Sequence, residues 1–274
     1  MVTHKDNRIV LNNTIAIPPI GLGLFKMGSD AIVTRSVHSA LRSGYRLFDT
    51  ASIYGNEHAL GKALKSSPVE REEIFITSKV WNSDHGYEKT LKAFDHTLKT
   101  LGTDYLDLYL IHWPGHNDVL PTYKALETLY EEKKVRTIGV SNFEISHLEK
   151  LLDHAHIIPA INQIEVHPLF QQRKVREFCE KHSIQIQSYS PLVRGSLDIP
   201  LIQSFALKYQ KSVAQVVLRW HIQHNMIPIP KSVHPHRIKE NIEIFDFSLT
   251  QQEMDELDAL ESDKRIGFDP RTFF

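Results

Sequence analysis

The chain contains little cysteine, carries little net charge and has no long apolar run. Cys179 is the only cysteine among its 274 residues, which excludes an internal disulfide framework and fits a reducing compartment. The 32 lysines and arginines nearly balance the 33 aspartates and glutamates, so the chain offers no basic field for nucleic acid. No apolar run is long enough to span a bilayer, and the segment MVTHKDNRIV lacks the apolar stretch of a signal peptide. We therefore expect a cytoplasmic protein that binds neither nucleic acid nor a membrane.

The motifs of common metal and nucleotide sites are also missing. Most of the 16 histidines are scattered singly, and no HExxH motif or HxH pair stands at the end of a strand, so we expect no metal site. The turn after the first expected strand reads GLGLFKMG, in which Lys26 takes the place of the third glycine of a GxGxxG fingerprint. An open, doubly wound sheet remains the structural alternative, but this turn argues against it.

What the sequence does contain is a regular alternation of apolar runs and helical patterns up to residue 242. Short apolar, β-branched runs with a polar residue at the far end are typical of buried parallel strands. The expected strands span residues 18–22, 46–49, 74–80, 106–111, 137–140, 160–164, 185–189 and 227–229. The expected helices span residues 30–43, 57–66, 86–101, 119–133, 144–153, 171–182, 201–224 (with an interruption) and 235–242. Because parallel strands need crossover connections and eight βα units fit this length, we predict an α/β fold, a (β/α)8 TIM barrel.

Two further segments flank the alternating pattern. RIVLNNTIAI predicts an N-terminal β-hairpin with its turn at Asn12 and Asn13. The segment from Ser248 to Phe274 begins with a capped helix in SLTQQEMDELDALE and finishes in an irregular tail. No linker or shift in composition marks a boundary, so residues 1–274 are expected to form a single domain.

Four polar residues each stand just past an apolar, β-branched run: Asp49, Tyr54, Lys79 and His112. In a parallel barrel the loops after the strands converge at one mouth, where catalytic residues lie. An ammonium group beside a tyrosine favours the phenolate, so Lys79 is expected to make the Tyr54 hydroxyl a better proton donor. Asp49 can hold Lys79 as an ion pair, and His112 can hydrogen-bond a substrate oxygen. A lone buried histidine or loop tyrosine is usually structural, but the four together suit proton delivery to a carbonyl oxygen.

Long motifs in a fixed order make the chain resemble a known family. They are GYRLFDTASIYGNEHALG (44–61), LGTDYLDLYLIHWP (101–114), IGVSNF (138–143), NQIEVHP (162–168), SYSPL (188–192) and IPKSVHPHRIKENI (229–242). On these motifs the sequence resembles the aldo-keto reductases, in particular their small bacterial-type members. The resemblance covers nearly the whole chain. It implies a (β/α)8 barrel, NADPH as the hydride donor, and Asp49, Tyr54, Lys79 and His112 as a catalytic tetrad.

The same resemblance implies where the nicotinamide end of the cofactor binds. Ser141, Asn142 and Gln163 stand at or just past the ends of the fifth and sixth expected strands, where amide and hydroxyl groups would meet the carboxamide of NADPH. Ser141 could instead cap a helix that begins at Glu144. Tyr189 is expected to stack on the nicotinamide ring, a role that rests on the SYSPL motif. The neighbouring cofactor positions in that motif are Ser190 and Leu192.

A second cofactor region is expected at the start of the last barrel helix, which has Pro235 in its first turn. A helix N-terminus attracts anions and an arginine adds fork-like donors, which suits the 2′-phosphate of NADPH. The residues expected there are Lys231, Ser232, Val233 and Arg237. Glu240 and Asn241, one turn further on, resemble the positions that hold the adenine. Solvated helix charges are the structural alternative for Arg237 and Glu240.

Aromatic residues at the same mouth are expected to wall an apolar substrate pocket. The expected pocket residues are Phe25, Trp81, His112 and Trp113. The connection after Trp113, residues 114–121, is short. The segment 193–200 is short too, and Val193 stands where related proteins often carry glycine. The mouth is therefore expected to be open and the selectivity loose.

These features together predict a monomeric, metal-free, NADPH-dependent reductase of aldehydes, small ketones or dicarbonyls. Tyr54 would supply the proton to the carbonyl oxygen. Two alternatives stay open. A regulatory or sensing barrel that binds NADPH with little turnover would need Lys231 and Arg237 but not Tyr54, so the intact tetrad argues against it. A barrel hydrolase lacks metal ligands and an evident pair of carboxylates across the mouth.

Overall fold

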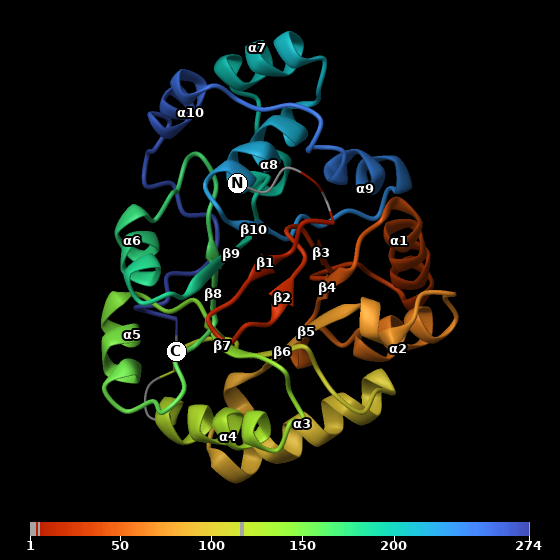
Figure 1. The fold of residues 1–274 in the computed structure, drawn as a ribbon, viewed down its shortest axis with the longest axis vertical. Helices are drawn as coiled ribbons and strands as arrows, with labels where there is room; N and C mark the ends of the chain where they lie inside the picture. Colours follow the sequence, from red (N-terminus) through yellow and green to blue (C-terminus); the bar gives the residue numbers. More distant parts are fainter. Residues whose placement is uncertain (1–3, 5, 116–117, 274) are drawn as a thin grey trace.

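The computed structural model describes residues 4, 6–115 and 118–273, and its centre is an eight-stranded sheet. Neighbouring strands in this sheet are parallel and follow one another in chain order. The strands are β3 (Leu22–Gly23), β4 (Leu47–Asp49), β5 (Phe75–Val80), β6 (Leu108–Ile111), β7 (Ile138–Ser141), β8 (Ile161–Glu165), β9 (Gln185–Tyr189) and β10 (Ile227–Pro228). Figure 1 shows these strands curled into a ring with helices around it.

Two backbone hydrogen bonds join the first and last segments of the sheet and close the ring. The Gly21 amide donates to the Pro228 carbonyl at 3.0 Å, and the Gly23 amide donates to the Pro230 carbonyl at 3.1 Å. Glycine is needed at position 23, because a Cβ atom there would lie 2.8 Å from the Ile229 carbonyl oxygen. The chain thus forms the predicted (β/α)8 barrel.

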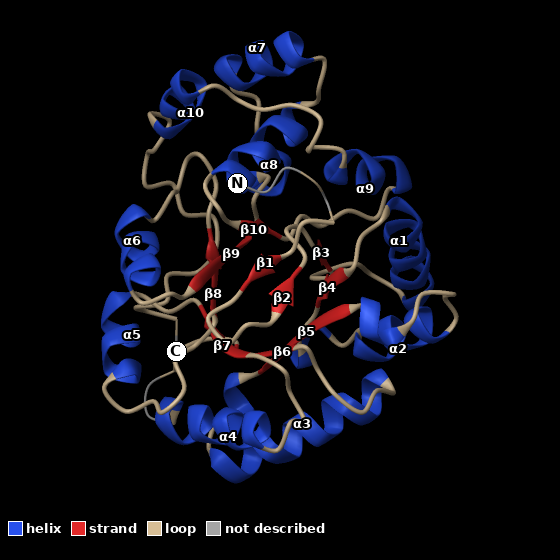
Figure 2. Cartoon of the chain, in the orientation of Figure 1, coloured by secondary structure: helices blue, strands red, loops and turns tan. Residues whose placement is uncertain are grey.

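Helices alternate with the strands and cover the outside of the barrel (Figure 2). They are α1 (Asp30–Ser43), α2 (Glu57–Lys65), α3 (Tyr87–Leu101), α4 (Val119–Glu131), α5 (Ile145–Leu152), α6 (Arg173–Lys181), α7 (Pro200–Tyr209), α8 (Val213–Gln223), α9 (Pro235–Ile242) and α10 (Gln251–Asp258). The expected interruption in 201–224 separates α7 from α8, where Gln210 is left-handed and the Ser212 side chain caps α8. Across the described residues, we find no helix with the length and apolar character needed to cross a membrane.

The first barrel strand is shorter than the sequence pattern predicted. The expected range was 18–22, whereas β3 spans Leu22–Gly23. Pro18 and Pro19 have no backbone N–H to contribute to a ladder, so the apolar run before β3 is not paired as a strand. Proline thus limits the strand despite the apolar pattern.

The N-terminal hairpin lies across one end of the ring, as Figure 1 shows. β1 (Ile9–Val10) and β2 (Ala16–Ile17) pair antiparallel across the predicted turn at Asn12 and Asn13, and a backbone hydrogen bond spans that turn at 3.0 Å. The apolar side chains that cluster at this end include Ile9, Leu11, Ile17, Leu47, Phe75, Leu108, Ile161 and Ile227. Most of these residues are the first residues of barrel strands, so the N-terminal ends of the strands form an apolar end of the barrel. The polar candidate site residues lie at the opposite end, where the strands end.

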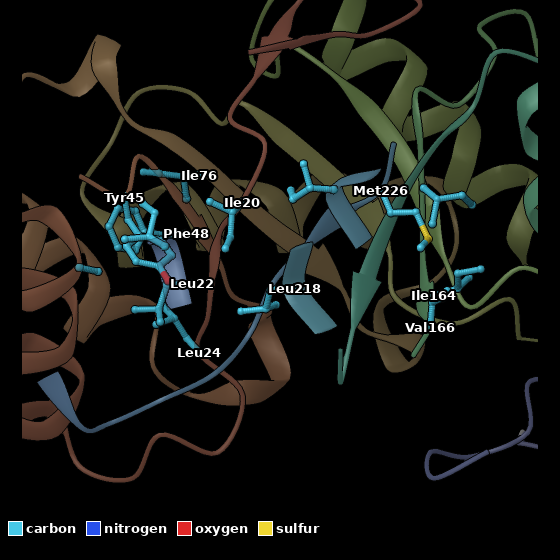
Figure 3. Packing of buried hydrophobic residues seen from close by; sticks show 14 of the residues in the cluster. Ile20, Leu22, Leu24, Tyr45, Phe48, Ile76, Ile164, Val166, Leu218 and Met226 are labelled. Carbon is cyan, nitrogen blue, oxygen red and sulfur yellow. The ribbon is translucent and has the colours of Figure 1, made fainter. Parts of the chain in front are cut away.

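Alternate residues of each strand face the barrel interior and the surrounding helices. In β4, Leu47 belongs to the interior cluster, whereas Phe48 packs in the outer core between sheet and helices, part of which Figure 3 shows. The side-chain period of a strand is two, so Asp49 lies on the interior side with Leu47. In β5 the same period places Lys79 on the interior side with Phe75. Strand geometry therefore aims both charged residues into the barrel.

The single cysteine, Cys179 on α6, is fully buried in the outer core. Its Sγ atom lies 3.8 Å from the amide nitrogen of Asn162. Burial raises the pKa of the thiol to about 12, so Cys179 is protonated and unreactive at neutral pH.

Candidate active site

Asp49 and Lys79 meet inside the barrel at the ends of the neighbouring strands β4 and β5. The Lys79 ammonium donates to Asp49 Oδ1 at 2.6 Å and to the Thr50 carbonyl at 2.8 Å. Burial raises the pKa of Asp49 and lowers the pKa of Lys79, while the attraction between the two opposes both shifts. Hydrogen bonds to both charged forms hold the two residues as an ion pair.

Tyr54 ends the short 3₁₀ helix η1 (Ser52–Tyr54) and lies beside this ion pair. The Lys79 Nζ atom is 5.1 Å from the centre of its ring, and the ring centre of His112 is 5.5 Å away in an edge-on arrangement. Gly55, with a φ of 65°, ends the 3₁₀ helix and turns the chain toward α2. The structure therefore brings the four residues of the expected tetrad together at one mouth.

The pKa of Tyr54 lies well above that of a free tyrosine, opposite to the direction expected from the sequence. Burial is the largest cause, followed by the electrostatic influence of Asp49 and of Tyr189. The Lys79 ammonium lies only 2.6 Å from the Asp49 carboxylate, whose negative charge acts on Tyr54 in the opposite direction, so burial and Asp49 decide the direction of the shift. Tyr54 is thus fully protonated at neutral pH, which is the form a proton donor needs.

His112 follows β6 and lies edge-on to Trp81, with 5.1 Å between ring centres. Burial, then the neighbouring Lys79 and His85, hold the pKa of His112 well below its usual value. Its Nδ1 atom is buried without a hydrogen-bond partner among the residues that the structure describes. The imidazole is therefore neutral at pH 7 and has one N–H to donate to an oxygen atom at the mouth.

Asn56, which the sequence reasoning did not single out, ties several loops of the mouth together. Its side-chain amide donates to the Leu24 carbonyl at 2.8 Å, and its Oδ1 accepts from the Thr50 hydroxyl at 2.6 Å. Thr50 in turn offers its carbonyl to Lys79. The available signal was the place of Asn56 in the YGNE motif, two residues after Tyr54.

Ser141, Asn142 and Gln163 form a hydrogen-bonded cluster beside the ion pair. Gln163 Nε2 donates to Asp49 Oδ2 at 2.6 Å, so the cluster contacts the tetrad directly. The Asn142 amide donates to Ser141 Oγ at 3.1 Å, and the Ser141 hydroxyl donates to the Gln163 carbonyl at 2.8 Å. The residue that caps the following helix is Glu144, so Ser141 is not the helix cap that the sequence left open.

Tyr189 ends β9 next to this amide cluster. Its hydroxyl donates to Asn142 Oδ1 at 2.7 Å, and burial raises its pKa. Ser190 and Val193, which follow, have φ values of 50° and 49° in the left-handed region, where a β-branched residue is strained. Leu192 between them is half-buried. The segment after Tyr189 is therefore a tight turn rather than a loose loop.

The cations expected to bind the 2′-phosphate lie around the start of α9, whose first residue is Pro235. Lys231 and Arg237 are both exposed, and neither has an ion-pair partner within the part of the chain that the structure describes. The Ser232 hydroxyl accepts from the His234 amide at 3.2 Å. Unpaired cations at a helix N-terminus fit a phosphate group. The other expected cofactor residues of this region are the half-buried Val233 and Glu240 and the buried Asn241.

The expected aromatic wall is present, but the C-terminal tail covers part of it. Phe25 is 48% exposed, and its ring centre lies 4.9 Å from that of Tyr54. Trp113 is only 8% exposed, because Phe268 and Phe273 pack against its ring, with 6.5 and 4.6 Å between centres. The mouth is thus closed on the Trp113 side, contrary to the open mouth that the sequence predicted.

A further expectation concerns the short connection after Trp113. The connection 114–121 includes His116 and Asn117, which lie outside the described residues.

Among the described residues, no group of three or more histidine, cysteine, aspartate or glutamate side chains could hold a metal ion. The absence of a metal requirement stays a prediction.

Comparison with known proteins defines the class to which this barrel belongs. Residues 19–262 match the model of the aldo/keto reductase family. The chain therefore belongs to the aldo-keto reductase family, and the resemblance read from its motifs is confirmed.

Individual relatives cover nearly the whole chain. It is 50% identical to a glyoxal reductase of Bacillus subtilis (strain 168) over 271 residues, 98% of each chain. It is 51% identical to a 9,11-endoperoxide prostaglandin H2 reductase of Trypanosoma cruzi (strain CL Brener) over 272 residues, 98% of this chain and 96% of the relative. The fold matches that of a Gox0644 variant solved in complex with NADPH, with a TM-score of 0.93, 41% identity, and 97% and 98% of the two chains covered. The chain is an oxidoreductase of the aldo-keto reductase type.

Proposed function

We propose that the protein reduces aldehydes, small ketones and dicarbonyls to alcohols with NADPH, and that Tyr54 is the proton donor. The observation that carries this proposal is the meeting of Tyr54, the Lys79–Asp49 ion pair and the neutral His112 at one mouth of the barrel. The protonated Tyr54 hydroxyl, the charged Lys79–Asp49 pair and the neutral His112 imidazole are the protonation states that carbonyl reduction needs. The alternative, a regulatory barrel, would not require them together.

Tyr54 acts by giving its hydroxyl proton to the carbonyl oxygen as negative charge develops there. Bound NADPH supplies the hydride that reduces the carbonyl carbon. Tyr54 starts fully protonated because its pKa is raised. As the proton leaves, the Lys79 ammonium, 5.1 Å from the ring centre, stabilises the developing phenolate. This stabilisation grows along the reaction, which is what lowers a barrier.

His112 and Asp49 orient the reacting groups. The neutral His112 donates one hydrogen bond to the carbonyl oxygen and so fixes its position relative to Tyr54. Asp49 holds Lys79 in place through the 2.6 Å ion pair. The aromatic residues around the mouth supply the apolar surface on which the rest of a substrate packs.

The cofactor residues divide into two groups on this chain. Ser141, Asn142 and Gln163 would hold the carboxamide, and Tyr189 would stack on the nicotinamide ring. The residues that would hold the phosphate and adenine end are Lys231, Ser232, Val233, Arg237, Glu240 and Asn241, with Ser190 and Leu192 along the path between. The hydrogen-bonded amides near the tetrad and the unpaired cations at α9 support this division.

The proposed substrate class follows from the arrangement of the mouth, where the small tetrad is surrounded by aromatic side chains. We propose that dicarbonyls such as glyoxal, the substrate named for the Bacillus subtilis relative, need only the tetrad. Aromatic aldehydes would gain by burying ring surface, at about 25 cal/mol per Å². We further propose that the chain acts as a monomer and as one domain in the cytoplasm.

A carbonyl panel tests this function. The purified protein is mixed with NADPH and with glyoxal, methylglyoxal or benzaldehyde, and NADPH consumption is followed by absorbance. We expect turnover of all three. Tight NADPH binding in a fluorescence titration with no consumption for any carbonyl would instead support the regulatory barrel.

A further inference from the structure

A buried carboxylate at the mouth, Glu165, binds the C-terminal tail and takes no part in the proposed proton transfer. Glu165 ends β8, two residues after Gln163, and is fully buried. Its Oε1 accepts from the Ile266 amide at 2.7 Å, and its Oε2 accepts from the Gly267 amide at 2.7 Å. His167 Nε2 lies 3.1 Å from Oε1. Both carboxylate oxygens therefore bind consecutive amides of the tail.

These contacts involve the charged form of Glu165. Burial acts to raise the pKa of this carboxyl, but the hydrogen bonds from His167, Ile266 and Gly267 outweigh it and hold the pKa below its usual value. Hydrogen bonds to an ionised acceptor are roughly twice as strong as neutral ones. The tail is thus attached at this point by charge-assisted bonds in a dry environment.

The attached segment also touches the residue proposed to stack on the nicotinamide. A Cβ atom on Gly267 would lie 2.6 Å from Glu165 Oε2 and 3.3 Å from the Tyr189 hydroxyl, so only glycine fits there without a shift. That hydroxyl donates to Asn142 Oδ1 at 2.7 Å. The tail therefore packs directly against the cofactor side of the mouth.

On its other side, the attached segment leads straight into the substrate wall. Phe268, the next residue, stacks on Phe273 with 4.3 Å between ring centres, and both rings pack against Trp113. A second fastening, the ion pair between Arg265 and Glu144 at 2.9 Å, lies just before the attached amides. The position of the two phenylalanines is thus set by where Glu165 holds the chain.

We propose that Glu165 is a positioning residue that fixes the tail and thereby determines which carbonyl substrates the enzyme prefers. The proposal rests on the carbonyl reductase function. Glu165 acts through Ile266 and Gly267, which place the tail phenylalanines beside the substrate. An aromatic aldehyde is large enough to contact this wall, whereas a small dicarbonyl is held by the tetrad alone. Glu165 therefore contributes to the binding of the first kind of substrate and not of the second.

Two variants break the attachment from opposite sides. In Glu165→Gln one carboxylate oxygen becomes an NH₂ group, which cannot accept a bond from a tail amide. In Gly267→Ala the added methyl pushes the tail off the carboxylate. The Glu165→Gln change alters a buried group, so Gly267→Ala, made in the tail itself, keeps the test decisive if the first variant folds poorly. Arg265→Gln is the matched control, because it removes a tail ion pair and leaves the Glu165 bonds intact.

Two measurements are made on each variant. Hydrogen–deuterium exchange of the peptide spanning 265–273 reports the tail bonds directly, and steady-state kinetics compares benzaldehyde with methylglyoxal. For Glu165→Gln and Gly267→Ala we expect tail exchange about ten-fold faster, the factor that corresponds to one lost charged hydrogen bond. We expect the KM for benzaldehyde to rise by about the same factor with little change in kcat, and the KM for methylglyoxal to stay constant. Arg265→Gln should change both readouts less.

The possible failures are distinguishable. Unchanged tail exchange in both variants, or equal KM changes for the two substrates, would overturn the role of Glu165. A wild-type protein that reduces neither carbonyl would overturn the proposed function itself.

Discussion

At Tyr54, two charged neighbours act in opposite directions on one hydroxyl. Burial and, after it, the Asp49 carboxylate favour the protonated hydroxyl, while the Lys79 ammonium stabilises the phenolate. Because Lys79 and Asp49 form a close pair of opposite charge, their effects on the phenolate partly offset each other. The ammonium thus makes the phenolate less unfavourable than burial and Asp49 alone would make it.

Replacing Tyr54 by phenylalanine removes the proton donor and leaves the ring. We expect Tyr54→Phe to bind NADPH as the wild type does and to reduce carbonyls more slowly by about 10² to 10⁴-fold, the usual contribution of general acid catalysis. Stopped-flow NADPH oxidation and fluorescence titration measure the two quantities. A Tyr54→Phe enzyme with a near wild-type rate would show that another group donates the proton.

Arg237 is expected to discriminate between the two nicotinamide cofactors. Arg237→Ala should weaken NADPH binding by about 1.5 to 3 kcal/mol, the contribution of a charged hydrogen bond, and leave NADH binding almost unchanged, since only NADPH has the 2′-phosphate. Fluorescence titration of both cofactors measures this. Lys239→Ala, an exposed cation on the same helix, is the control and should affect neither cofactor. Equal losses for both cofactors in Arg237→Ala would exclude a phosphate site.

The four tetrad residues could be found in the sequence because each lies at the end of an apolar strand or in the loop after one. Asn56 and Glu165 could not be assigned in the same way. Their partners are backbone groups of residues far away in the chain, the carbonyl of Leu24 and the amides of Ile266 and Gly267. No residue type marks a backbone partner, so only the folded chain reveals these contacts.

Among the elements, α10 is fastened to α8 through its last residue, Asp258. Asp258 Oδ1 accepts from the Trp220 indole at 2.7 Å and lies 2.8 Å from His224 Nε2. Trp220 is fully buried, so its indole N–H has no access to water. The Asp258 carboxylate therefore fixes the start of the tail, and the Glu165 carboxylate fixes its middle.

Removing this carboxylate should destabilise the fold. We expect Asp258→Ala to lower the free energy of unfolding by about 2 kcal/mol, because it leaves the buried Trp220 N–H without an acceptor. Asp255→Ala, on the exposed face of the same helix, is the matched control and should change stability by less than about 0.5 kcal/mol. Urea unfolding followed by tryptophan fluorescence compares the two, and equal effects would argue against the role of Asp258.

Helices were more predictable than the ends of strands and the tail. The pattern 30–43 coincides with α1 and 235–242 with α9, since periodic apolar positions and a proline at the first turn mark such helices. The tail, by contrast, has no periodic pattern, and its position is set by Glu165 and by the edge-on contact of Phe268 with Trp113. The closed mouth could not be read from local sequence.

Over the whole molecule, burial of neutral histidines links stability to pH. His221 lies between the Val217 and Val166 carbonyls, and burial lowers its pKa to about 4. Burial lowers the pKa of His85 to about 4 as well. In the unfolded chain both histidines have pKa values near the usual 6.5. Between pH 6.5 and pH 4 the unfolded state therefore binds more protons than the folded state. Their contribution to stability is present above pH 6.5 and is lost as the pH falls toward 4.

We therefore expect acid to destabilise the barrel before its carboxylates titrate. The free energy of unfolding should fall by about 2 kcal/mol for His221 alone between about pH 7.5 and pH 5. Urea unfolding at several pH values measures this. A midpoint that stays constant down to pH 5 would contradict the expectation.

The buried, protonated state of Cys179 makes this chain a natural platform for site-specific labelling. Because the native thiol does not react at neutral pH, a cysteine introduced on the tail, for example by Arg271→Cys, becomes the sole target for a maleimide dye or a spin label. A paramagnetic or fluorescent probe at that point would record how often the tail leaves Trp113 in solution. No background cysteine would first have to be removed from the core.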